Sequence, residues 1–98
     1  MGNHTEGRIG WCIFTNTLFA GKIPVYQNED ENPVVFESEL EAQRVIAEEL
    51  RDHLQEFLSS GREFDDAIAS DDFVEQVSVL ADGSVVDKDG RHFMKGNW

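Results

Sequence analysis

Residues 38–59 constrain the fold more than any other part of the chain, because their pattern fits a single kind of element. Ser38 and Glu41 form the S-x-x-E arrangement of a capping box, so a helix is predicted to begin at Ser38. The helix is expected to run to about Ser59, where Gly61 supplies a stop. One face must then be buried against another part of the chain. The residues of that face recur at three- and four-residue intervals and are Ala42, Val45, Ile46, Leu50, His53, Leu54, Phe57 and Leu58.

Short runs of β-branched and aromatic residues lie on both sides of this helix and predict strands. Residues 9–26 are expected to form two strands joined at Asn16, with Pro24 at a sheet edge or beside a bulge because proline has no N–H. Residues 33–36 are expected to form a third short strand. Two further strands are predicted after the helix, at 73–80 and 84–86, joined by an Asp-Gly turn.

The order of these elements predicts a small α+β domain, β-β-β-α-(α)-β-β. The second helix is short, lies within residues 62–72, and has Asp65 and Asp66 in its first turn. A chain of 98 residues fits one domain, 1–98, and residues 1–8 are expected to be a flexible arm. The expected architecture is an antiparallel sheet of about five strands with the long amphipathic helix packed on one face.

The chain is strongly acidic, and the acid is unevenly distributed. Its 20 Asp and Glu residues against eight Lys and Arg give a net charge of −12. Sixteen of the acidic residues fall within residues 29–75, where only Arg44, Arg51 and Arg62 oppose them. This balance argues against direct binding to nucleic acid or to an anionic membrane, because both interactions need Lys and Arg. The expected partner is a basic protein surface, and a nucleic-acid-binding protein is one form of it.

Acidic side chains of this middle segment are the candidate binding residues. We expect the loop at 27–32, the outer face of the helix and the connection at 62–72 to form one negative surface. Glu48, Asp52 and Glu56 recur at roughly one-turn spacing, so their charges lie about 5 Å apart, and Glu39 precedes them on the same helix. Phosphates along a DNA strand have a comparable spacing, which predicts a nucleic-acid mimic. The alternative is that the charge serves solubility alone. The predicted contact residues are Glu29, Asp30, Glu31, Glu41, Glu48, Asp52, Glu56, Asp65 and Asp66.

No catalytic, metal or cofactor motif accompanies this charge, so we expect a non-enzymatic protein without a cofactor. His4, His53 and His92 lack zinc-ligand spacing, and Cys12 is the single cysteine. Neither a glycine-rich phosphate loop nor a serine nucleophile motif occurs. His53 is interpreted as a satisfied core or boundary residue. The alternative, a small enzyme, would use His53 as a general base oriented by Glu49 four residues earlier.

A third function class is a scaffold or self-associating domain. It would use the edge strand near Pro24 and two aromatic residues expected to be exposed, Tyr26 and Trp98. The chain is accordingly expected to be a monomer or a weak homodimer. Its size, acidity and α+β order are similar to those of small phage and mobile-element proteins, including inhibitors of restriction and CRISPR complexes. That resemblance is one of composition and implies an inhibitory protein-binding role.

The single cysteine also bears on location. Cys12 lies in an apolar run, so it is interpreted as a small buried side chain and not as a reactive thiol. An unpaired cysteine without a secretory signal indicates a reducing, cytoplasmic setting. No apolar stretch approaches the roughly 18 residues that cross a bilayer.

Overall fold

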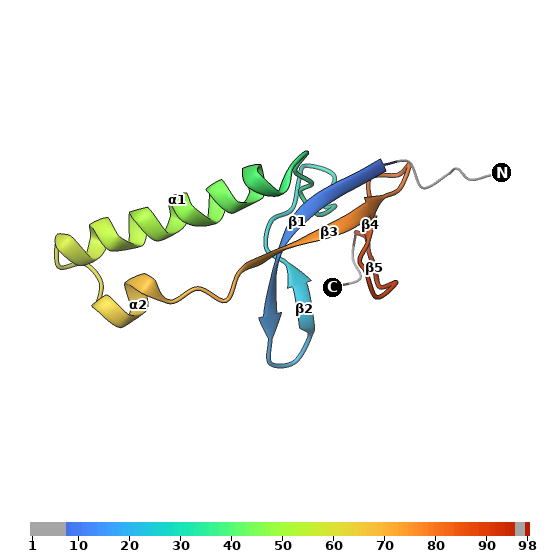
Figure 1. The fold of residues 1–98 in the computed structure, drawn as a ribbon. Coiled ribbons are helices and arrows are strands. Elements are labelled where there is room, and N and C mark those ends of the chain that lie inside the picture. Colours follow the sequence, from blue (N-terminus) through green and yellow to red (C-terminus); the bar gives the residue numbers. More distant parts are fainter. Residues whose placement is uncertain (1–7, 96–97) are drawn as a thin grey trace.

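The computed structural model describes residues 8–95 and 98, and within them the architecture is α+β, as predicted (Figure 1). A five-stranded antiparallel sheet carries one long helix and one short helix. Arg8 pairs with Val79 in the sheet, so the expected arm ends before it, and residues 1–7 lie outside the described part. The elements in chain order are β1 (Arg8–Thr17), β2 (Gly21–Pro24), α1 (Glu39–Leu58), α2 (Phe64–Ile68), β3 (Phe73–Val79), β4 (Val85–Val86) and β5 (His92–Phe93).

The strands are arranged in the order β2-β1-β3-β4-β5, with every neighbouring pair antiparallel. β1 is long enough to serve two partners, and Phe14 is opposite Pro24 of β2 on one side and Phe73 of β3 on the other. Pro24 therefore lies on an edge strand, which confirms the prediction made from its missing N–H.

The core lies on one face of the sheet and is built from alternating residues of the strands. Cys12 and Phe14 of β1 pack with Val77 and Val79 of β3, and Val85 and Phe93 complete the cluster. The Phe14 and Phe93 rings are tilted, with their centroids 5.2 Å apart. On the opposite face α1 contacts β1 and β3, and there Ile13 is also buried. The two faces of β1 are thus covered by different parts of the chain.

The start of α1 has the predicted N-cap, although the Glu41 side chain bonds the residue before Ser38 and not Ser38 itself. Ser38 is the N-cap with extended backbone, and its Oγ accepts the amide N–H of Glu41 at 3.1 Å. Glu41 Oε1 in turn accepts the amide of Glu37 at 3.1 Å. The end of the helix differs in one detail, because the left-handed residue is Ser60, with φ of 68°, and not Gly61. The amide of Gly61 reaches back to the carbonyl of Glu56 at 2.7 Å, which closes the helix.

Three predicted strand features are wrong. Asn16 lies inside β1, because the chain reverses only after Thr17. There Thr17 Oγ1 accepts a hydrogen bond from the amide of Ala20 and donates one to the carbonyl of Gly21. Gly21 has a φ of +70°, which suits the turn. Residues 33–36 form no strand: Phe36 makes an isolated bridge with Trp11 of β1, Pro33 bridges Gln27 outside the sheet, and Val35 packs on the core. The fifth strand is instead β5, around Phe93, a residue expected only to pack.

Candidate functional site

Helices α1 and α2 form an arm, residues 39–68, that projects from the sheet (Figure 1). α1 contacts both β1 and β3, and Ala42 is its single fully buried residue. The last turn of α1 passes beyond the sheet and packs on α2 alone, through the Phe57 and Phe64 rings at 5.3 Å. The expectation that the whole apolar face of the helix is buried is therefore wrong for its end, from Leu54 onward, where Leu58 is 78% exposed.

The arm carries most of the acid that the sequence places in mid-chain. It holds nine carboxylates against three arginines, and eight of the nine are exposed, the exception being the half-buried Glu49. All six predicted contact residues on the arm are among the exposed ones. Because α1 projects into solvent, these charges reach a partner without obstruction from the sheet. The six are Glu41, Glu48, Asp52, Glu56, Asp65 and Asp66.

Part of this charge is neutralised within the arm. Arg62 donates to Glu56 and to Asp66, each at 2.6 Å, so it joins the end of α1 to α2. The hydrogen bond to Glu56 raises the pKa of Arg62, and the one to Asp66 adds to it. Asp52 lies 3.9 Å from Arg51 on the exposed surface. Among the described residues, Glu48 and Asp65 have no ion-pair partner.

The structure does not bring the predicted loop residues to the arm. Glu29, Asp30 and Glu31 lie in a turn organised by Asn28, whose Oδ1 accepts the amides of Asp30 and Asn32. The Asn32 side chain donates to the Asp82 carbonyl at 3.2 Å, which places this turn at the far end of β3. Asp65 and Asp66 precede the near end of β3, and α1 is about 30 Å long. The three loop residues therefore lie far from Asp65 and Asp66, and the nine predicted residues do not form one surface.

A pocket of about 200 Å³ lies where α1 meets the segment between α2 and β3. His53 lines it, and its Nδ1 is buried without a hydrogen-bond partner among the described residues. No group of three or more histidine, cysteine or acidic side chains within residues 8–95 is arranged to hold a metal ion. The lining residues are Thr15, Ile46, Glu49, Leu50, His53, Ala69, Ser70, Asp71 and Asp72.

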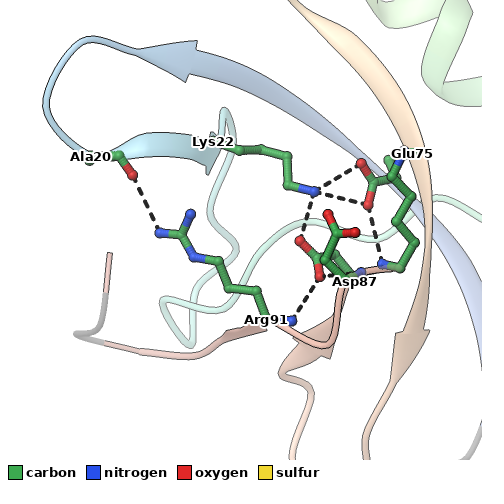
Figure 2. Close-up of polar contacts among 7 residues, drawn as sticks. Ala20, Lys22, Glu75, Asp87 and Arg91 are labelled. Atoms are coloured by element: carbon green, nitrogen blue, oxygen red, sulfur yellow. Dashed lines mark hydrogen bonds and ion pairs between the residues drawn. The ribbon is translucent and has the colours of Figure 1, made fainter.

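A second charged cluster lies across the sheet from the arm, and Figure 2 shows its contacts. Lys22 Nζ contacts Glu75 Oε1 at 2.9 Å and Asp87 Oδ2 at 2.7 Å, and the Asp87 side chain is only 1% exposed. Asp87 Oδ1 also accepts the amides of Asp89 and Arg91. Burial alone would raise the pKa of Asp87, but the hydrogen bonds from Lys22 and Arg91 outweigh it and hold the pKa below its usual value.

This Lys22 cluster is structural, and sequence reasoning missed it. It joins β2 to β3 and to the turn after β4, both of which lie far from β2 along the chain. Lys22 also lies over the Phe14 ring at 5.1 Å, so the cluster covers the edge of the core. No pattern of spacing relates Lys22 to Asp87, because the sheet topology alone makes them neighbours.

The aromatic residues named for self-association are not the exposed ones. Trp98 is half-buried and packs on Phe93 with ring centroids 6.4 Å apart, and Tyr26 is also half-buried. The most exposed aromatic side chain is Phe19, at 98%, in the β1–β2 turn beside Leu18, at 91%. The interpretation of Cys12 as a buried side chain is confirmed.

Comparisons with family models, with curated proteins and with solved structures found no match to this chain. Of the helices in the described part, none is both long and apolar enough to cross a membrane.

Proposed function

We propose that this chain is a non-enzymatic protein-binding module that presents its acidic arm to a basic partner. The observation that carries the proposal is the placement of eight exposed carboxylates on a projecting arm with only three arginines, of which Arg62 is already paired with Glu56 and Asp66. A charge distribution of this kind accelerates association with a positive surface and selects against negative ones. Solubility alone requires neither a projecting helix nor acid concentrated on it.

In its specific form the module is a nucleic-acid mimic that blocks a basic nucleic-acid-binding protein. Glu48, Asp52 and Glu56 follow one another by one helical turn on the outer face of α1, all exposed. Successive charges rise about 6 Å along the axis, a spacing that suits a groove built for phosphates. The composition, similar to that of small phage inhibitors, supports the same role. The unpaired Cys12 supports a reducing, cytoplasmic setting.

The test is competition with DNA. Proteins of a cell lysate are bound to DNA–cellulose and eluted with the purified chain. The eluted proteins are identified by mass spectrometry, and each is then assayed separately for competition between the chain and DNA. We expect a specific basic protein to be released, with an affinity that falls steeply as salt increases. Replacing Glu48 and Asp52 by lysine should abolish the release while the circular dichroism spectrum stays unchanged.

The matched control reverses two charges elsewhere. Glu29→Lys with Asp30→Lys changes the net charge by the same amount, but at the far end of the molecule. This variant should retain most of the competing activity. If both variants lose the same amount of competing activity, net charge alone explains the effect. Unchanged release of the DNA-bound protein by the Glu48 and Asp52 variant would refute the proposal.

A further inference from the structure

The end of the arm exposes a continuous apolar surface that the sheet does not cover. We call it the distal patch. The exposed fractions of its side chains range from 36% for Phe57 to 78% for Leu58. Single exposed apolar residues are ordinary on protein surfaces, whereas a contiguous group marks an interaction site. The patch consists of Leu54, Phe57 and Leu58 from α1 and of Phe64 and Ile68 from α2.

The five side chains form one surface because each is next to another. Leu54 is three residues before Phe57 and four before Leu58, so the three share one side of α1. The Phe57 and Phe64 rings meet edge to face at 5.3 Å, which joins the two helices. Ile68 follows Phe64 by four residues on α2, whose inner residue Ala67 is fully buried. The ion pairs of Arg62 hold α2 against α1 in this arrangement.

The rim of the distal patch is negative. Glu63 and Asp65 flank Phe64, are exposed, and have no cation within ion-pair distance among the described residues. The charge of Arg62 is already engaged by Glu56 and Asp66. Arg51, three residues before Leu54 on α1, lies 3.9 Å from Asp52. An apolar centre with an acidic rim is complementary to an apolar stripe flanked by Lys and Arg.

We propose that the distal patch seats a basic amphipathic helix of the partner protein. This inference rests on the proposed function and names the contact that would anchor it. The apolar stripe of the helix would cover Leu54, Leu58 and Ile68, while its flanking cations would pair with Glu63 and Asp65. Charge favours this occupant over a second copy of the chain, because each copy carries −12 and brings the same acidic rim.

The test uses two fluorescent peptides of leucine and lysine with identical composition. One is patterned as an amphipathic helix and the other is permuted to spread its leucines around the helix. We expect the wild-type chain to bind the patterned peptide at least about tenfold more tightly. Leu58→Gln with Ile68→Gln should remove that preference. Leu18→Gln with Phe19→Gln, which removes more exposed side chains at the β1–β2 turn, should leave it intact.

Three outcomes would overturn the inference. One is equal binding of the two peptides, since charge alone would then explain the interaction. Another is retention of the preference in the Leu58 and Ile68 variant. The last is a concentration-dependent dimer in sedimentation equilibrium that the same variant abolishes, because the occupant would then be a second copy. The Glu48 and Asp52 variant is scored separately by DNA competition, so the acidic-arm function can stand when the distal patch fails.

Discussion

Lys22 Nζ lies 2.7 Å from Oδ2 of Asp87, and this contact ties the edge strand β2 to the turn that follows β4. The Lys22 side chain is 15% exposed and that of Asp87 is 1% exposed, so water screens the pair poorly. The charge of Asp87 is tolerated in this position because Lys22 and two backbone amides satisfy it.

Lys22→Met should therefore lower the free energy of unfolding by about 3 kcal/mol, because it leaves the buried Asp87 carboxylate without its cation. Urea denaturation at neutral pH measures the change. The control is Lys95→Met, which removes the same charge from an exposed pair with Glu31 at 3.8 Å. That variant should lose less than about 1 kcal/mol. Similar losses in the two variants would contradict the structural role of the Lys22 cluster.

Acid should destabilise the protein through Asp87. Its pKa in the folded state is below the usual 3.8, so its contribution to stability is complete above that value and is lost as the pH falls through the folded pKa. Asp82, whose pKa is lowered by hydrogen bonds from Ser84, acts in the same direction. Asp87→Asn should be less stable than the wild type at neutral pH. Between about pH 5 and pH 3, however, its free energy of unfolding should fall by less than that of the wild type. A steeper acid loss in this variant than in the wild type would be inconsistent with the shifted pKa.

Two phenylalanines provide a test of the core. Phe14→Ala should cost about 3–5 kcal/mol, because the ring is fully buried among Phe73, Phe93 and the β3 valines. Phe19→Ala should change the free energy of unfolding by less than about 0.5 kcal/mol, because that ring is 98% exposed. Thermal or urea unfolding distinguishes the two. A large loss for Phe19→Ala would show that the β1–β2 turn packs on another part of the chain.

The Cys12 thiol should be inert in the folded protein. Burial, and secondarily the nearby Glu75 carboxylate, raises its pKa to about 12, so almost no thiolate is present at about pH 8. Reaction with a chromogenic disulfide reagent should therefore follow unfolding, and increasing urea should increase its rate. Immediate stoichiometric labelling without denaturant would disprove the burial of Cys12.

The elements that were predicted correctly depend on neighbours in the chain. The capping box of Ser38 and Glu41 and the 3.6-residue period determine a helix wherever it lies. The short helix with Asp65 and Asp66 in its first turn and the edge position of Pro24 follow from the same local chemistry. The prediction at Asn16 was wrong because a turn-forming residue also fits a strand when the hydrogen bonds of Thr17 and the φ of Gly21 place the reversal later.

The candidate site was only partly predictable for a related reason. Periodicity shows that Leu54, Phe57 and Leu58 share a face with Ala42, but it does not show how far the sheet extends beneath the helix. The sheet ends before these residues, so a predicted core stripe becomes the distal patch. Likewise, the number of acidic residues between 29 and 75 does not show where they lie in space. The turn at Glu29 and the carboxylate of Asp65 are separated by about the length of α1.

The amino-acid sequence by itself determined the α+β class, the long capped helix and the negative charge of mid-chain, because propensity, capping and net charge are properties of residues and their near neighbours. The tertiary structure decided which strands pair, that Lys22 meets Asp87, and which end of α1 remains uncovered. Those outcomes depend on sheet order and on the length of α1 relative to the strands beneath it, and both are set by contacts between residues far apart in the chain.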